Sequence, residues 1–333
     1  MKNIMRMALM VGVAVGALWA VSGDRGYTQA ADPNAAPNPY KMQDNWLQLP
    51  EGRQLGGAIK VQVDHTDGKS IWVFDRCSSN ACNPIQKFDS SGKFVRGFGA
   101  DMFNQPHGLY VDNEGNVWAA DNGARNGKGA IVVKFSPTGQ VLMTLGKAGM
   151  PGNAEGFFNG ASSVVVAPNG DIFVGDGHGG NTNDRVVKFD RSGKQIATWG
   201  KHGKGQGEFD QLHGIAMDSQ GRIFVADRGN SRVQIFDSNG KFVAEWKQFG
   251  RPSDVSIDKN DVIYVTDDQS NQTTNPGFKN GIRVGSAKDG KVTAFIPTLN
   301  AEIATPEGVG VDNAGNVYGS WTGKMAVRRW TKN

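Results

Sequence analysis

Three residues with metal-binding side chains occupy one repeated position in this sequence of 333 residues. His107, His213 and Glu307 each lie five residues before the Asp of a turn, in QPHGLYVDNEGNVWAAD, QLHGIAMDSQGRIFVAD and TPEGVGVDNAGNVYGSW. Imidazole nitrogens and carboxylate oxygens bind Zn²⁺, and a set of two His and one Glu occurs in catalytic zinc sites that keep a position for water. The pattern therefore predicts zinc, although copper, manganese and iron accept the same ligand types. The alternative is that each His is a hydrogen-bonded structural residue.

The elements that must position these residues are repeated hairpins. Six copies of a turn-and-strand segment recur at a spacing of about 40 to 55 residues, and most are followed by a second hairpin. Four short strands per unit are typical of a β-propeller blade. The sequence therefore predicts an all-β fold, a six-bladed β-propeller. The six copies are DHTDGKSIWVFD, DNEGNVWAAD, APNGDIFVGD, DSQGRIFVAD, DKNDVIYVTD and DNAGNVYGSW.

A position that repeats in every blade of a propeller becomes a ring of residues around the central channel. The first strand of each blade lines this channel, and the two His and the Glu fall in blades two, four and six. Alternate blades are about 120° apart in a six-fold ring, so these side chains are expected to converge on the axis. The six residues at this position are Ile59, His107, Ser162, His213, Ser253 and Glu307.

The sixth copy ends without a fourth strand, after AVRRWTKN. A segment near the N-terminus, DNWLQLP at residues 44–50, has no hairpin partner, so we expect it to supply the missing strand and close the ring without an exposed edge. Residues 31–43, rich in Pro, Asn and Ala, are predicted to be an irregular lead-in. The propeller is thus assigned to residues 44–333.

The first 30 residues have the features of a secretory signal peptide. Two basic residues precede an uncharged run from Met7 to Val21, and small and polar residues follow. A membrane anchor is the alternative, but the run is shorter than the roughly 20 residues that span a bilayer. We therefore expect export to the periplasm or the extracellular space, with no membrane association after cleavage.

Charge and cysteine content restrict the partners and the compartment. After removal of residues 1–30, the chain has 33 basic and 31 acidic residues, interspersed, so nucleic acid is not an expected partner and we predict a monomer. Cys77 and Cys82, the only cysteines, are predicted to form a disulfide in an oxidising compartment. Zinc binding by this pair is the weaker interpretation, because thiolate zinc sites usually have further cysteines.

Three more residues are predicted to lie at the mouth of the channel, because each follows the second strand of a blade. Arg76 and Arg228 could hold a carboxylate or stabilise negative charge on oxygen. The alternative for each is a solvated ion pair with a neighbouring Asp. His178, in the glycine-rich segment GDGHGGNTND, could transfer a proton near neutral pH, or it could be an ordinary surface histidine.

The repeats resemble those of the NHL family, which combine a G-x-(I/V)-(Y/F)-V-x-D segment with an N-x-R-(I/V)-x-x-F segment. The copy formed by residues 221–227 with Asn230, Arg232 and Phe236 fits this pattern best. The resemblance implies a propeller and does not by itself imply catalysis, because NHL propellers are commonly binding platforms.

Residues 55–330 also resemble the peptidyl-α-hydroxyglycine α-amidating lyases, six-bladed zinc propellers that convert a peptidyl α-hydroxyglycine into a peptide amide and glyoxylate. The likeness is clearest at QPHGLYVDNEGNVWAAD, GDIFVGDGHGG, GEFDQLHGIAMDSQGRIFVADRGNSRVQIF and TPEGVGVDNAGNVYG. It implies that His107 and His213 match two of three zinc-binding His, and that Arg76 and Arg228 match two active-site Arg.

The chain departs from that family at three positions. Glu307 stands where the third zinc-binding His would be, Gly308 stands where an Asp associated with a structural calcium would be, and His178 replaces a Tyr. A His₂Glu set is compatible with catalytic zinc. The glycine weakens the expectation of calcium, although channel carbonyls could still bind it.

These observations predict an exported, metal-dependent lyase that acts on a peptidyl α-hydroxyglycine or a related N-acyl carbinolamine. The alternative is a non-catalytic NHL propeller that binds a protein or peptide on its channel face. A calcium-dependent lactonase is the least favoured class, because the channel positions offer too few Asn and Asp residues for a calcium cage.

Overall fold

The computed structural model describes residue 32 and residues 34–333, with the exception of 78–81, 181, 299–305 and 324–325. The predicted signal peptide at residues 1–30 lies outside the described residues. All regular elements of the described part are strands, and no helix long and apolar enough to cross a membrane occurs in it.

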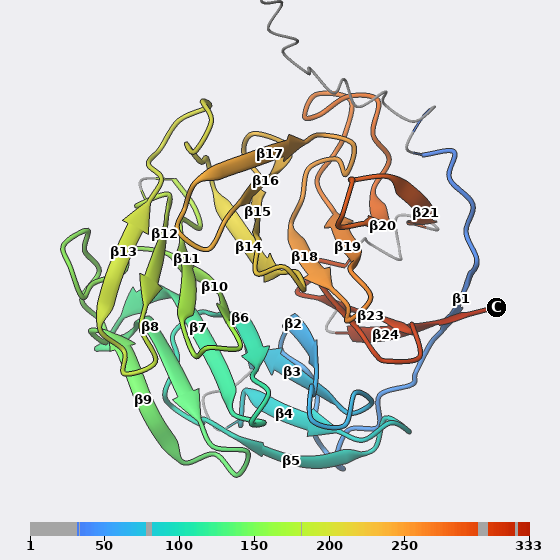
Figure 1. The fold of residues 1–333 in the computed structure, drawn as a ribbon. Helices are drawn as coiled ribbons and strands as arrows, with labels where there is room; N and C mark the ends of the chain where they lie inside the picture. The colour runs from blue at the N-terminus through green and yellow to red at the C-terminus, as the bar shows by residue number, and fades with distance from the viewer. Residues whose placement is uncertain (1–31, 33, 78–81, 181, 299–305, 324–325) are drawn as a thin grey trace, which may run out of the picture.

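Six four-stranded antiparallel sheets surround a central channel, which confirms the predicted six-bladed β-propeller (Figure 1). Blades one to five each follow chain order, and blade six has the order β1-β24-β23-β22. The strands are β1 Tyr40–Gln43; β2 Ala58–Val63, β3 Ile71–Asp75, β4 Ile85–Phe88 and β5 Phe94–Phe98; β6 Pro106–Val111, β7 Val117–Arg125, β8 Lys128–Phe135 and β9 Val141–Gly146; β10 Ala161–Val166, β11 Ile172–Asp176, β12 Arg185–Phe189 and β13 Gln195–Trp199; β14 Leu212–Met217, β15 Ile223–Asp227, β16 Arg232–Phe236 and β17 Phe242–Trp246; β18 Asp254–Ile257, β19 Val262–Asp267, β20 Gly281–Ser286 and β21 Val292–Pro297; and β22 Gly308–Val311, β23 Val317–Trp321 and β24 Ala326–Lys332.

The position of a strand in its blade explains its residue pattern. The second strands, such as β3, β11 and β15, are buried at every position, because neighbouring blades cover both of their faces. The outer strand β13 instead alternates between half-buried and exposed residues, because it faces solvent. Hydrophobic clusters fill the space between adjacent blades. Between blades one and two, for example, the ring of Phe98 lies 5.6 Å from that of Trp72 and 5.3 Å from that of Phe135.

The turn between the first two strands of a blade is stabilised by its Asp. In blade two the Asp112 carboxylate accepts hydrogen bonds from the backbone N–H of Glu114 (3.0 Å) and Asn116 (2.8 Å). Gly115 has φ 81°, a left-handed conformation that favours glycine. In blades two, four and six the turn has the pattern D-x-x-G, which fixes the hairpin that precedes the buried second strand.

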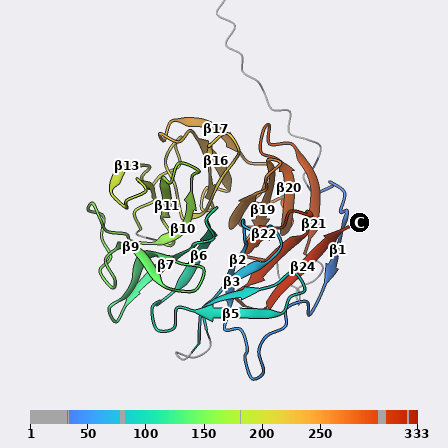
Figure 2. The same cartoon turned by 60° about the horizontal axis from the view of Figure 1, so that its bottom comes forward.

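An N-terminal strand closes the ring, as predicted, but it is not the predicted segment. Strand β1 pairs with β24 from Tyr40↔Lys332 to Gln43↔Arg329, so residues 40–43 belong to the propeller and not to an irregular lead-in (Figure 2). Tyr40 packs into the core of blade six and Lys41 faces solvent. The ladder pairs the two ends of the chain.

The predicted closing segment, residues 44–50, instead lies against blade one. The Gln48 backbone N–H donates to the Gly92 carbonyl (2.7 Å), next to the outer strand β5. Trp46 is buried, with its ring 5.2 Å from that of Tyr318 in blade six. The apolar residues of this segment therefore pack between the first and last blades. Their hydrophobicity is explained by this packing and not by a place in the closing strand.

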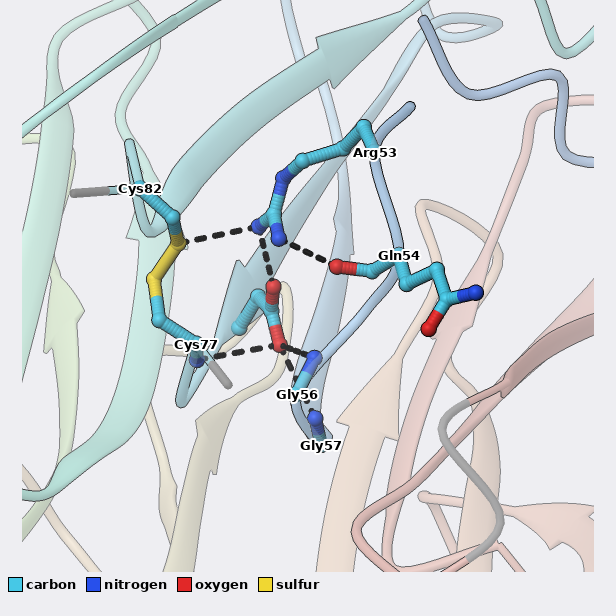
Figure 3. The surroundings of a disulfide bond; sticks show 7 residues. Arg53, Gln54, Gly56, Gly57, Cys77 and Cys82 are labelled. Carbon is cyan, nitrogen blue, oxygen red and sulfur yellow. Dashed lines mark hydrogen bonds and ion pairs between the residues drawn. A yellow bond between two sulfur atoms is a disulfide. The ribbon is translucent and has the colours of Figure 1, made fainter. Parts of the chain in front are cut away.

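Cys77 and Cys82 form the predicted disulfide, with Cα atoms 5.9 Å apart (Figure 3). The guanidinium of Arg53 contacts the Cys82 sulfur (3.0 Å) and forms an ion pair with the buried carboxylate of Asp75. That carboxylate also accepts the backbone N–H of Gly56 (2.8 Å). The bridge and the ion pair thus hold the end of β3 against the segment that leads into β2.

Candidate metal centre

The six residues predicted to form a ring do line one cavity in the channel. In blades one to four the ring residue is the extra residue of a β-bulge between the first and second strands. In blade two, for example, the pairing passes from Pro106↔Asp121 to Gly108↔Ala120 and omits His107. The same shift omits Ile59, Ser162 and His213. A bulge turns a side chain out of the regular alternation of a strand, which aims these side chains at the axis.

Carboxylates at the ends of the second strands fix the segments that lead to the two ring histidines. In blade two, Asp121 accepts the backbone N–H of Gln105 (2.8 Å), two residues before His107. In blade four, Asp227 accepts the N–H of Asp210 (2.8 Å), three residues before His213. Both carboxylates are fully buried. In blades one to five, the Asp that ends the second strand therefore fixes the segment before the ring residue of its own blade.

The two ring histidines are held in one tautomer by backbone carbonyls of the next blade. Nδ1 of His107 lies 2.6 Å from the Ser162 carbonyl oxygen, and Nδ1 of His213 lies 2.5 Å from that of Ser253. A carbonyl oxygen only accepts, so each Nδ1 carries the proton and each neutral ring presents an unprotonated Nε2 to the channel. Metal-binding histidines are usually fixed in this way.

Three hydrogen-bond acceptors consequently face one another. The Nε2 atoms of His107 and His213 are 3.3 Å apart, and Nε2 of His213 is 3.4 Å from Oε1 of Glu307. With Zn–N bonds of about 2.0–2.1 Å, the edges of a tetrahedron measure about 3.3–3.4 Å. Thr322 Oγ1 donates to the other carboxylate oxygen of Glu307 (2.9 Å). The two imidazole nitrogens and the carboxylate oxygen therefore fit a zinc ion. Such an ion would relieve the repulsion among their lone pairs.

A glycine follows each of these three residues because the next blade approaches closely. A Cβ at Gly108 would lie 2.6 Å from the Ser162 carbonyl oxygen, which is the acceptor for His107. A Cβ at Gly308 would lie 2.5 Å from the carbonyl oxygen of Ile59. The backbone of β2 leaves no room for a carboxylate at position 308, so the structure adds no support to the expectation of calcium.

Burial keeps the ring histidines neutral. Burial lowers the pKa of His107 and of His213 well below the usual value. The next largest cause is electrostatic repulsion, from His178 in the case of His107 and from Arg228 in the case of His213. Neutral imidazoles are the form that binds a metal.

His178 joins this cluster rather than the protein surface. Its ring centroid lies 4.4 Å from that of His107 and 4.8 Å from that of His213. The ligand atoms of His107, His178, His213 and Glu307 all lie within 4.8 Å of one another. Burial, followed by the charge of Arg228, lowers the pKa of His178 to about 4. The alternative of an ordinary surface histidine is therefore wrong.

The two predicted arginines also lie at the site. Arg76 donates from Nε to the Pro106 carbonyl (3.2 Å), one residue before His107. Arg228 is 6% exposed and donates to the side chain of Gln211 (3.2 Å), while its Nε has no hydrogen-bond partner among the described residues. Neither arginine has a side-chain ion pair within 4.0 Å in the described part of the chain. Burial lowers the pKa of both arginines. The charge of Glu307 opposes this shift most at Arg76, whereas the charge of Asp268, followed by that of Glu307, opposes it at Arg228.

Sequence reasoning missed Asp268, which directly follows β19. This is the position that Arg76 and Arg228 occupy in their blades, so the repeat alignment contained the signal. The Asp268 carboxylate accepts a hydrogen bond from the hydroxyl of Ser253, whose carbonyl holds His213. Burial raises the pKa of Asp268 to about 6, and the charge of Glu307 adds to the shift. A second missed feature is the buried ion pair of Lys60 and Asp254, which lies in the channel wall.

The raised pKa of Asp268 predicts a stability effect in protein stripped of metal. Between the ordinary value of 3.8 and the folded value of about 6, the folded state retains a proton that the unfolded chain has released. The wild-type protein therefore loses stability as pH rises through this interval. Asp268→Asn cannot ionise and should be more stable above about pH 7, by up to about 3 kcal/mol.

Urea unfolding with a chelator, at about pH 4 and about pH 7.5, measures this difference. The gain should appear at the higher pH only, and the exposed carboxyl variant Asp101→Asn should show no such gain. An equal effect of Asp268→Asn at both pH values would contradict the assigned pKa.

Comparisons with known proteins agree with this architecture. A family model described as NHL repeat matches residues 103–127 and 209–236, the two segments that contain His107 and His213. Two of the six blades thus contain segments that match the NHL repeat. Two solved structures share the fold of this propeller, each with a TM-score of 0.57. One is a streptogramin B lyase, which is 17% identical over 88% of this chain and 98% of that one. The other is a gluconolactonase from Xanthomonas campestris, which is 13% identical over 89% of this chain and 95% of that one.

The curated relatives of this propeller fall into two groups. NHL repeat-containing protein 3 of Homo sapiens is 30% identical over 62% of this chain and 59% of that protein. A probable peptidyl-alpha-hydroxyglycine alpha-amidating lyase of Caenorhabditis elegans is 35% identical over 41% of this chain and 38% of that protein. The peptidyl-alpha-hydroxyglycine alpha-amidating lyase 1 of Drosophila melanogaster is 39% identical over 34% of this chain and 20% of that protein. The propeller thus spans less than two thirds of each of these relatives, and it resembles the amidating lyases.

Proposed function

We propose that this propeller is an exported, metal-dependent lyase that cleaves the C–N bond of a peptidyl α-hydroxyglycine or a related N-acyl carbinolamine. The observation that carries the proposal is the convergence of three unprotonated acceptors, from His107, His213 and Glu307, beside two arginines without ion-pair partners in the described part of the chain. Its resemblance to the amidating lyases gives further support.

The reaction moves one proton from oxygen to nitrogen and cleaves the C–N bond. The hydroxyl O–H breaks, its oxygen forms a C=O bond with the same carbon, and the C–N bond breaks. The amide nitrogen then takes a proton, which gives a peptide amide and glyoxylate. A zinc ion held by His107, His213 and Glu307 would polarise the hydroxyl and lower its pKa. The remaining tasks belong to the side chains around it.

The arginines fit the substrate carboxylate. Arg228 is buried, with Asp268 and Glu307 as the negative charges that act on it most. Its Nε has no hydrogen-bond partner among the described residues, so a carboxylate oxygen would satisfy a polar atom that is costly to leave unpaired. Arg76 follows β3 of blade one, across the ring from blade four, and would contact the same carboxylate from the other side of the channel. Together they would orient the hydroxyl-bearing carbon toward Glu307 and the two ring histidines.

A side chain must also accept the hydroxyl proton and return a proton to the amide nitrogen. Besides the three predicted ligands, the two arginines and the Lys60–Asp254 ion pair, His178 and Asp268 are titratable groups at the site. Either could act as the proton carrier.

Export is supported by the disulfide between Cys77 and Cys82, because such bonds persist in oxidising compartments. The closed ring leaves its inner strands paired and its apolar residues between blades, which supports a monomer.

Glyoxylate release from a peptidyl α-hydroxyglycine by zinc-loaded protein tests the proposal. Arg228→Gln should lower kcat/KM roughly 10- to 100-fold, the value of one hydrogen bond to a charged group. The variant should lose little with an N-hydroxymethyl amide, which has the carbinolamine without the carboxylate. Arg96→Gln, on the exposed outer strand β5, is the matched control.

The outcomes are distinct. No glyoxylate at any zinc loading would exclude the reaction and favour a binding propeller. An equal loss with both substrates would show that Arg228 does not bind the carboxylate.

A further inference from the structure

His178 is held so that its ring projects over the ring histidines. The backbone N–H groups of Gly177 and His178 both donate to the Gly160 carbonyl, at 2.9 and 3.1 Å. Position 160 must be glycine for this contact, because a Cβ there would lie 3.0 Å from the His178 nitrogen, and its φ is 118°. The base of the loop is thus fixed by the segment that leads into β10.

The orientation of this ring matches that of the other two. A hydrogen bond links the His178 ring to its own backbone carbonyl, as the carbonyls of blades three and five hold His107 and His213. Each ring therefore has one nitrogen committed to a carbonyl and one available to the channel. This arrangement is typical of histidines that bind metals.

The geometry points to His178 as a fourth protein ligand, which would complete a set of three imidazoles and one carboxylate around the metal ion. This inference rests on the proposed metal site and deepens it. The four ligand atoms lie within 4.8 Å of one another, and two of the distances, 3.3 and 3.4 Å, equal tetrahedral edges. A small rotation of the His178 side chain would bring its nitrogen to the fourth corner.

A fourth protein ligand changes what the site can do. A zinc ion with four protein ligands has no free tetrahedral corner for water, in contrast to catalytic sites with three. A substrate hydroxyl would then have to enter as a fifth ligand or replace His178, whose loop contains Gly177, Gly179 and Gly180. The role of proton carrier passes to Asp268, the other of the two candidates.

Metal affinity and spectroscopy test this assignment without any activity assay. We would measure Zn²⁺ affinity by competition with a chromophoric chelator, and Co²⁺ coordination by visible absorption, for full-length wild-type protein and His178→Ala. The variant should bind Zn²⁺ about 100-fold more weakly. Loss of a residue that only supports a ligand costs about 10- to 100-fold in metal affinity, and loss of a direct ligand should cost at least the upper end of that range. X-ray absorption of the Zn²⁺ forms should show one imidazole fewer.

His202→Ala is the matched control, because its imidazole is 71% exposed and paired with Asp184 outside the channel. It should leave affinity and spectra unchanged. Equal Zn²⁺ affinity and equal imidazole number for wild type and His178→Ala would overturn the assignment. The three-residue site would stand if His107→Ala still weakened Zn²⁺ binding. A wild-type protein that binds neither Zn²⁺ nor Co²⁺ would overturn this inference and the metal-dependent function together.

Discussion

Replacing His213 or His107 by alanine should weaken Zn²⁺ binding by roughly 100- to 1000-fold. Zinc sites with four ligands bind with about 10–16 kcal/mol, so the loss of one ligand removes about 3–4 kcal/mol. Competition with a chelator measures the affinity. Lyase activity at limiting zinc should be lost in the same variants.

Thermal unfolding gives a second readout for the same variants. Excess Zn²⁺ stabilises a folded protein that binds it, by about 4 kcal/mol at 1000 times the dissociation constant. The wild-type protein should therefore gain stability with Zn²⁺, and the alanine variants should gain little. In the presence of a chelator the variants should not be much less stable, because each removes one of two facing lone pairs that are 3.3 Å apart.

Ser162→Ala is the control for these experiments, since it alters the same ring position in a neighbouring blade but leaves the carbonyl that holds His107. It should retain Zn²⁺ binding. Unchanged affinity in His107→Ala and His213→Ala would show that the two histidines are only hydrogen-bonded, which is the alternative that the sequence left open.

Removal of β1 should produce the largest loss of stability. A chain that starts at Asp44 would lose four paired residues of the closing ladder and the buried ring of Tyr40, which is 7% exposed. The free energy of unfolding should fall by about 3–5 kcal/mol, because the buried surface of one aromatic side chain and the hydrogen bonds of the ladder are lost. The free edge of β24 would also promote association between molecules. Thermal unfolding and light scattering measure the two effects.

A chain that starts at Asn38 is the matched control, because it retains β1. It loses Asn34, whose side chain binds the buried guanidinium of Arg283 (2.7 Å), so a smaller decrease is expected. Equal unfolding temperatures for the two shortened chains would show that β1 is dispensable for ring closure.

The repeat in the sequence was sufficient to predict the blades and the ring of channel residues. The Asp that ends a second strand recurs in blades one to five and the D-x-x-G turn in blades two, four and six, so the alignment places His107, His213 and Glu307 at equivalent points. It could not show the β-bulges that aim His107 and His213, because a bulge depends on the register between two strands.

The remaining features depend on tertiary contacts that a repeat does not encode. Strand β1 has only four residues, and its partner lies at the other end of the chain, whereas the more apolar Trp46 segment packs between blades. His178 lies in a loop whose path depends on the Gly160 carbonyl. Asp268 was missed because only arginines and histidines were considered at the channel mouth.

The pairing of β1 with β24 also determines when the molecule can finish folding. Residues 326–332 are synthesised long after residues 40–43, and until they are present β1 has no partner strand. A premature stop that removes only these few residues would therefore leave the sixth blade half built, and it would be as damaging as a much larger deletion.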